Sequence, residues 1–133
     1  MNNLPLYVTD THSLIWYLFD SPKLSRAASE AFRKVEEGRA RLIIPAIVIA
    51  ELIYTVESGK VKANIDNLIH RIDESMNFDI ASLGINQLRC LRQNTQIPEM
   101  HDRLIVCEAL LNGAKLITKD KKIKKAGVVE VIW

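Results

Sequence analysis

Hydrophobic and polar residues follow two patterns along this chain. Short apolar runs predict strands, and apolar residues at helical spacing predict helices between them. Short runs rich in β-branched and aliphatic residues are typical of buried strands. They occur at 6–10, 41–44, 77–83, 115–120 and 128–133. Between them, apolar residues recur every three or four positions, as on the buried face of a helix. These helical patterns cover 11–19, 23–38, 45–57, 62–75, 85–94 and 98–112, with a short basic turn or helix after 120.

Strands that alternate with helices favour an α/β domain with a mostly parallel central sheet. Glycines support these boundaries, because each of four follows a helical pattern, where a left-handed residue commonly ends a helix: Gly38, Gly59, Gly113 and Gly127. Pro45 and Pro98 stand where helices are expected to begin. No glycine-rich phosphate-binding loop is present, which argues against dinucleotide and P-loop nucleotide binding.

Composition changes this picture little. The 133 residues predict one domain spanning 1–133, with 48% hydrophobic and 26% charged residues and a net charge of +2. Such a charge does not hold a protein on nucleic acid by itself. Cys90 and Cys107 lack metal-site spacing and are expected to be buried thiols. The chain starts without a signal-peptide pattern and its apolar run 44–56 is too short for a bilayer, so we expect a cytoplasmic protein without membrane contact.

The apolar run 44–56 contains one charged residue, Glu51. A buried carboxylate without a partner costs several kcal/mol or protonates. Its neighbours on the same helical face, which include Ile47, Tyr54 and Thr55, offer no cation. Either the Glu51 carboxylate reaches water, or a positive charge meets it elsewhere in the fold.

Three other acidic residues are expected at the same place as Glu51. Asp10 and Asp120 end predicted strands, and Asp102 lies near the start of a helix. The carboxyl ends of parallel strands share one edge with the first turns of the helices that follow, so the four acids should converge there. Taken singly, Asp10 also suits a helix N-cap, Asp102 a favourable position in the helix dipole, and Asp120 a solvated turn.

Converging carboxylates repel one another unless a cation joins them. An all-oxygen ligand set suits Mg²⁺ or Mn²⁺. Such a site can polarise a phosphodiester and activate water. The pattern therefore predicts nuclease-type chemistry, although spacing alone does not specify it.

The chain also resembles the PIN-domain ribonucleases, particularly VapC-type toxins of prokaryotic toxin–antitoxin pairs. The resemblance rests on "VTDTHSLIWYL", "IPAIVIAELIYTVESGK" and "IPEMHDRLIVCEALLNGAKLITKDKKIKKAGVVEVIW". It implies a three-layer α/β/α domain and a Mg²⁺- or Mn²⁺-dependent endoribonuclease, a homodimer whose site an antitoxin occludes. By resemblance, Asp10, Glu51 and Asp102 match the core metal-binding acids, Asp120 the fourth, and Thr118 an accessory polar group. The segment "PEMHDR" departs from the "DPFDR" of close relatives, which places Glu99 and His101 at the rim of the site.

Other polar and aromatic residues allow more than one role. Lys119, Lys121 and Lys122 belong to a lysine-rich turn that is either solvated surface or a contact for RNA phosphates. Arg103 suits a phosphate or the neighbouring carboxylate equally. Trp16 and Tyr17 are expected in the core or a dimer interface, with base stacking as the less favoured alternative. The histidines His12, His70 and His101 lack zinc-site spacing and suit capping or surface positions.

Two other functional classes compete with the nuclease. A phosphoryl-accepting signalling domain needs an acidic pair after the first strand, and a haloacid-dehalogenase phosphatase needs D-x-D there. Position 12 is His and a single Asp stands in "LYVTDTH", which disfavours both. The remaining alternative is a non-catalytic PIN-like domain that binds RNA or protein, although no member of the acidic set is missing.

Overall fold

A computed structural model describes residues 3–133 and contains a five-stranded sheet flanked by seven helices. The strands are β1 (Leu6–Thr9), β2 (Arg41–Pro45), β3 (Phe78–Ala81), β4 (Lys115–Ile117) and β5 (Val131–Ile132). The helices are α1 (Thr11–Leu18), α2 (Arg26–Glu36), α3 (Ala46–Glu57), α4 (Ile65–Glu74), α5 (Ile85–Gln93), α6 (Met100–Asn112) and α7 (Lys121–Ala126). The predicted order of strands and helices is confirmed.

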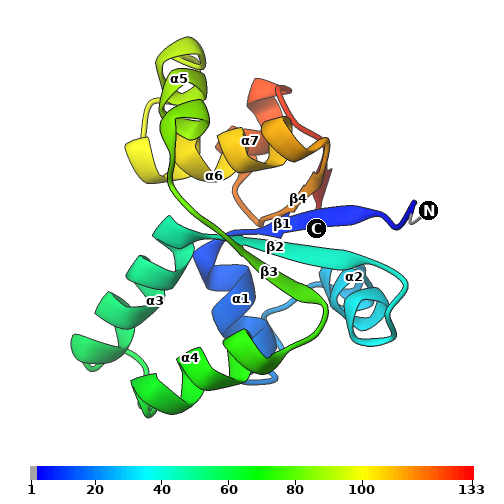
Figure 1. The fold of residues 1–133 in the computed structure, drawn as a ribbon, viewed down its shortest axis with the longest axis vertical. Coiled ribbons are helices and arrows are strands. Elements are labelled where there is room, and N and C mark those ends of the chain that lie inside the picture. The colour runs from blue at the N-terminus through cyan, green and yellow to red at the C-terminus, as the bar shows by residue number, and fades with distance from the viewer. Residues whose placement is uncertain (1–2) are drawn as a thin grey trace.

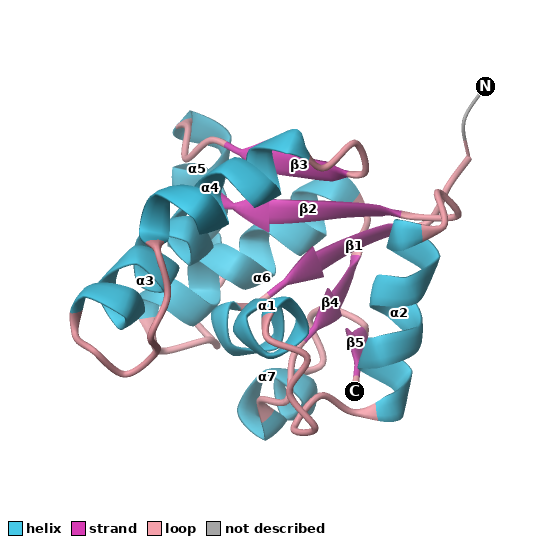
Figure 2. Ribbon diagram, turned by 90° about the horizontal axis from the view of Figure 1, so that it is seen from below, coloured by secondary structure: helices cyan, strands magenta, loops and turns pink. Residues whose placement is uncertain are grey.

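The sheet is parallel throughout, with strand order β3-β2-β1-β4-β5. Helices α1 to α4 lie on one side of it and α5 to α7 on the other (Figure 1). Figure 2 looks onto the face of the sheet and shows its strands side by side in this order. The three-layer α/β/α prediction is therefore confirmed.

The core follows from this sandwich. The central strands are covered on both faces, so nearly all of their side chains are buried, including Val8, Leu42, Ile44 and Leu116 at 0% exposure. From the helical layers, Phe32 and Ile105 are each 1% exposed. The two cysteines are buried free thiols, as expected.

Helix boundaries agree with the glycine pattern but not with both prolines. Gly38, Gly59, Gly113 and Gly127 all have positive φ, which glycine adopts without steric cost. Pro45 ends β2 and is the N-cap of α3. Pro98 does not begin a helix: α6 starts at Met100, because the Glu99 side chain caps it by accepting a hydrogen bond from the Asp102 amide.

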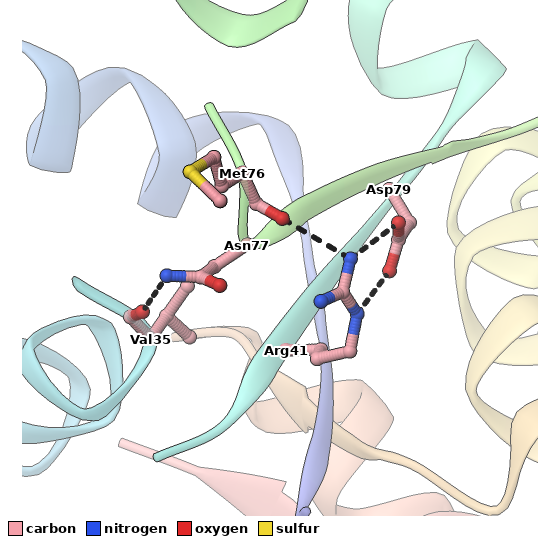
Figure 3. Close-up of polar contacts among 5 residues, drawn as sticks. All are labelled: Val35, Arg41, Met76, Asn77 and Asp79. Carbon is pink, nitrogen blue, oxygen red and sulfur yellow. Dashed lines mark hydrogen bonds and ion pairs between the residues drawn. The ribbon is translucent and has the colours of Figure 1, made fainter. Parts of the chain in front are cut away.

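The edge strand β3 is fastened by polar contacts that sequence patterns did not indicate (Figure 3). Arg41 donates to both carboxylate oxygens of Asp79, at 2.7 and 2.8 Å, and to the Met76 carbonyl at 3.3 Å. The Asn77 amide donates to the Val35 carbonyl at 2.9 Å. These contacts tie the entry to β3 onto β2 and the end of α2.

The chain changes direction across the sheet at β1. From β1 it runs outward through β2 to β3, and it then returns to the other side of β1 to form β4 and β5. Such a reversal opens a crevice beyond the carboxyl ends of the two central strands, here β1 and β4. Asp10 follows β1 and Thr118 follows β4, so both lie at this crevice.

Candidate metal centre

An acidic cleft of about 770 Å³ opens at the switch between β1 and β4. All four predicted acids line it: Asp10, Glu51, Asp102 and Asp120. Each is partly buried, and each comes from a different segment of the chain. The expected convergence of these side chains is therefore seen, while their role as metal ligands stays a prediction.

Asp10 has two roles that sequence analysis treated as alternatives. Its Oδ1 accepts a hydrogen bond from the Ser13 amide at 2.9 Å and so caps α1. Its Oδ2 accepts from the Thr118 hydroxyl at 2.5 Å. The cap and the threonine together fix the orientation of this carboxylate at the floor of the cleft.

Thr118 links two of the acidic residues. Its side chain is fully buried, and its hydroxyl accepts from the Asp120 amide at 3.1 Å while donating to Asp10. Asp120 in turn caps α7, because its Oδ1 accepts from the amides of Lys122 and Ile123. Asp120 is thus an N-cap rather than a freely solvated turn residue, and it still lines the cleft.

Glu51 meets a hydroxyl rather than a cation. The Thr11 hydroxyl, itself 8% exposed, donates to Glu51 Oε1 at 2.6 Å. None of the ion pairs in residues 3–133 involves Glu51 or the other three cleft acids. Although Lys119 and Lys121 also line the cleft, neither forms an ion pair with these four carboxylates.

Asp102 shows the electrostatic consequence. Burial, followed by the negative charges of Glu99, Asp120, Glu51 and Asp10, raises its pKa to about 6. An acid in the first turn of a helix would ordinarily be stabilised in its charged form. The repulsion within the cleft and the loss of water outweigh that benefit.

Glu99 and His101, which were expected at the rim of the site, form a hydrogen-bonded pair with each other. Glu99 accepts from His101 Nδ1 at 2.6 Å, and this hydrogen bond raises the pKa of His101. Although burial acts in the opposite direction, hydrogen bonds from the Asp102 amide and from His101 lower the pKa of Glu99. Glu99 lines the cleft, as expected of a rim residue.

The lysines of the basic turn line the cleft and its surroundings, whereas Arg103 does not. Lys119 and Lys121 line the acidic cleft, and Lys121 and Lys122 line an adjoining hollow of about 430 Å³. Within residues 3–133 Arg103 forms no ion pair with the neighbouring Asp102 carboxylate, and a phosphate contact stays a prediction. Arg103 donates instead to the carbonyls of Ile97 at 2.6 Å and Leu91 at 3.2 Å, which fastens the loop between α5 and α6.

Oxygen donors make up the acidic side of the cleft, which is the chemistry that Mg²⁺ or Mn²⁺ requires. Glu51 Oε2 and both carboxylate oxygens of Asp102 accept no hydrogen bond from the described part of the chain. As the side chains stand, no three His, Cys, Asp or Glu residues within 3–133 are close enough to enclose an ion. The donor set fits such a cation, and binding requires the carboxylates to turn inward.

Sequence reasoning missed three polar residues at this site. Thr11 and Thr55 line the cleft, and the buried Ser13 hydroxyl has no hydrogen-bond partner within residues 3–133. Thr11 and Ser13 lie within three positions of Asp10 in "DTHS", and their proximity to that acid was the available signal. Thr55 lies one helical turn after Glu51 and donates to its carbonyl at 2.8 Å.

Known structures share this fold at low sequence identity. VapBC2 from Rickettsia felis, bound to a promoter DNA fragment, aligns with a TM-score of 0.67 at 19% identity, covering 95% of this chain and 96% of that one. A toxin–antitoxin complex from Klebsiella pneumoniae gives 0.67 at 19% identity, over 92% and 94%. DNA-bound VapBC from Salmonella typhimurium gives 0.67 at 18% identity, over 96% and 97%.

No curated protein sequence matches the chain significantly. No helix in residues 3–133 is long and apolar enough to cross a membrane. The family model of the PIN domain matches residues 7–129, which includes all four cleft acids. The chain therefore belongs to the PIN-domain family.

Proposed function

We propose that this protein is a Mg²⁺- or Mn²⁺-dependent endoribonuclease, a single PIN domain spanning residues 1–133 that acts as the toxin of a VapBC-type pair. Membership of the PIN family implies nuclease activity in general terms. The observation that carries the proposal is the set of four partly buried carboxylates in one cleft, which come from four segments and form no ion pair within residues 3–133. The choice of RNA as the substrate rests on the resemblance to VapC-type ribonucleases.

In this proposal Asp10, Glu51, Asp102 and Asp120 hold the cation. When bound, it would polarise the scissile phosphodiester and lower the pKa of the attacking water. Thr118 and Thr11 orient Asp10 and Glu51 through the hydrogen bonds described above. These bonds restrain Asp10 and Glu51, while the carboxylate of Asp102 accepts no hydrogen bond within residues 3–133 and is free to turn toward the cation.

Lysines beside the cleft supply the complementary charge for RNA. Lys119, Lys121 and Lys122 flank the acidic side chains from the β4–α7 junction. A phosphate backbone that crosses this junction would exchange its counterions for lysine ammonium groups, so binding should weaken as salt rises.

Substitution of single acids tests the catalytic proposal. Asp10→Asn and Asp102→Asn keep side-chain size and should abolish Mn²⁺-dependent cleavage of RNA while the circular-dichroism melting curve stays cooperative. Asp73→Asn on α4 is the matched control, because Asp73 is exposed and does not line the cleft. Cleavage at the wild-type rate by both cleft variants would refute the assignment.

The proposed partners are a VapB-like antitoxin and a second copy of the chain, in the cytoplasm. VapBC complexes among the structural neighbours support the antitoxin. Exposed apolar residues of α3 support self-association, since Tyr54 is 75% exposed and only Val48 and Leu52 of this helix are buried. A small upstream gene that encodes a DNA-binding domain and a tail would support the toxin role. Sedimentation equilibrium reports the dimer directly.

The non-catalytic alternative keeps the cleft but not the chemistry. A PIN-like domain that only binds RNA or protein would show no Mn²⁺ binding at millimolar concentration by calorimetry. The complete acidic set favours the enzyme.

A further inference from the structure

Trp16 lies at the border between the acidic cleft and a second hollow. It lines the cleft together with His12 and Lys119. It also lines a neighbouring cavity of about 280 Å³ that extends over α1 and α2. Although Trp16 packs partly against the core, its side chain is only partly buried. Of the two expected positions, core and dimer interface, the structure therefore shows partial core packing, and the dimer interface stays a prediction.

An aromatic surface runs along α1 away from the cleft. His12 and Trp16 are four residues apart, so they occupy the same face of the helix, and their ring centroids are 5.8 Å apart. His12 is exposed. Trp133, which directly follows β5, packs against Trp16 with ring centroids 5.7 Å apart and planes tilted by 57°. In contrast, Tyr17 stacks on Phe32 at 4.3 Å and so faces α2, as a core residue would.

Two ammonium groups lie beside this aromatic surface. Lys119 Nζ is 5.8 Å and Lys23 Nζ is 6.0 Å from the centroid of the Trp16 ring. These distances are at the outer limit of a cation–π contact, so each contact is weak and easily displaced. Both lysines are exposed and form no ion pair within residues 3–133. Packing of Trp16 in the core does not require ammonium groups beside its ring. Their presence instead suits a ligand that has both an anionic and an aromatic group.

We propose that Trp16, flanked by His12 and Lys119, is a stacking platform for an unpaired RNA nucleotide next to the phosphodiester held in the acidic cleft. The proposal rests on the ribonuclease function above and specifies its substrate as single-stranded RNA. An aromatic ring accepts any base by stacking, and Lys119 is placed to contact the adjoining phosphate. Bases in a duplex are already stacked and cannot reach the ring.

Binding can be measured apart from cleavage. The probe is a fluorescently labelled single-stranded RNA of mixed sequence, with the same strand annealed to its complement for comparison. Anisotropy titrations run in Ca²⁺, and gels confirm that the RNA stays intact. Trp16→Leu should weaken single-strand binding roughly 5- to 150-fold, the usual range for losing one base–aromatic stack. Trp16→Phe should restore most of that affinity, and duplex affinity should not change.

Fluorescence gives a second readout, because the chain contains two tryptophans. In Trp133→Phe, Trp16 is the single tryptophan, and single-stranded RNA should quench its emission while the duplex should not. Lys119→Gln should reduce the slope of log affinity against log salt by about 1, as expected for losing one phosphate contact.

Three outcomes would overturn the platform. The first is a Trp16→Leu protein that binds single strands as tightly as wild type, which would assign Trp16 to the core or to a protein partner. The second is a folded Trp16→Phe protein that binds as weakly as Trp16→Leu, and the third is wild-type protein that binds duplex as well as single strands. The proposed function fails separately, if the wild-type protein neither binds nor cleaves RNA.

Discussion

Replacing Glu51 by Gln separates a metal ligand from a structural carboxylate. Glu51 is partly buried in the cleft and accepts the Thr11 hydroxyl at 2.6 Å. Glutamine has the same shape and keeps a carbonyl oxygen that can accept this proton. The substitution therefore removes one negative charge and leaves the packing of α3 in place.

The expected change in folding free energy is small because two effects oppose each other. A hydrogen bond to a charged acceptor contributes about 1 kcal/mol more than one to a neutral acceptor, and this difference is lost. Removing the charge relieves repulsion, since Glu51 is among the groups that raise the pKa of Asp102 to about 6. Without metal, the free energy of unfolding of Glu51→Gln should stay within about 1 kcal/mol of wild type.

Metal affinity should change much more. A neutral amide is a poor ligand for Mn²⁺, so the Kd should rise at least tenfold, which corresponds to about 1.4 kcal/mol, and RNA cleavage should be lost. Urea denaturation in EDTA measures the folding term and calorimetry with Mn²⁺ the binding term. Thr11→Val is the matched control, because it removes the same hydrogen bond and keeps the charge. A Glu51→Gln protein that unfolds readily yet binds Mn²⁺ normally would show that Glu51 is structural.

Three further predictions concern stability and reactivity. Thr118→Val should lower the free energy of unfolding by about 1–2 kcal/mol, seen in urea titration, because a buried hydroxyl that joins two acidic residues is lost. The Cys107 thiol, whose pKa is raised by burial and by its neighbour Cys90, should react with Ellman's reagent at pH 8 only after unfolding in urea. Hydrogen bonding to Arg41 lowers the pKa of Asp79, so this pair stabilises the fold above about pH 4 and its contribution is lost as pH falls further. Asp79→Asn should accordingly cost about 0.5 kcal/mol at pH 7, a small value because the pair is solvent-screened, and progressively less as the wild-type carboxylate protonates at acidic pH.

Much of the fold could be predicted from local patterns. The alternation of apolar runs and helical periodicity indicated all five strands and the order of the helices, because burial of each element leaves its period in the sequence. Boundaries were less certain: the last strand is Val131–Ile132 rather than 128–133. Its end depends on pairing with β4, which covers two residues, and a strand extends only where a partner offers hydrogen bonds.

The candidate site could be predicted as far as its acids. Topology places Asp10, Glu51, Asp102 and Asp120 at one edge of the sheet, because parallel strands and their crossover helices share that edge. The hydrogen-bond partners of individual side chains could not be predicted from topology in this way. Arg103 was open to a phosphate or a carboxylate and instead holds two carbonyls, because its direction depends on how the α5–α6 loop packs.

Two glutamates show where the sequence stops being informative. Glu51 and Glu108 each stand as a single acid in an apolar helical run, and sequence alone gives both the same environment. In the fold, Glu51 reaches the cleft, whereas Glu108 is 4% exposed and accepts from the amides of Asn112 at 2.7 Å and Gln87 at 3.4 Å. The sequence by itself determined the α/β order and the acids at the strand ends. Only the tertiary structure decided which carboxylate faces the cleft, because that depends on which groups the packing of other helices brings opposite it.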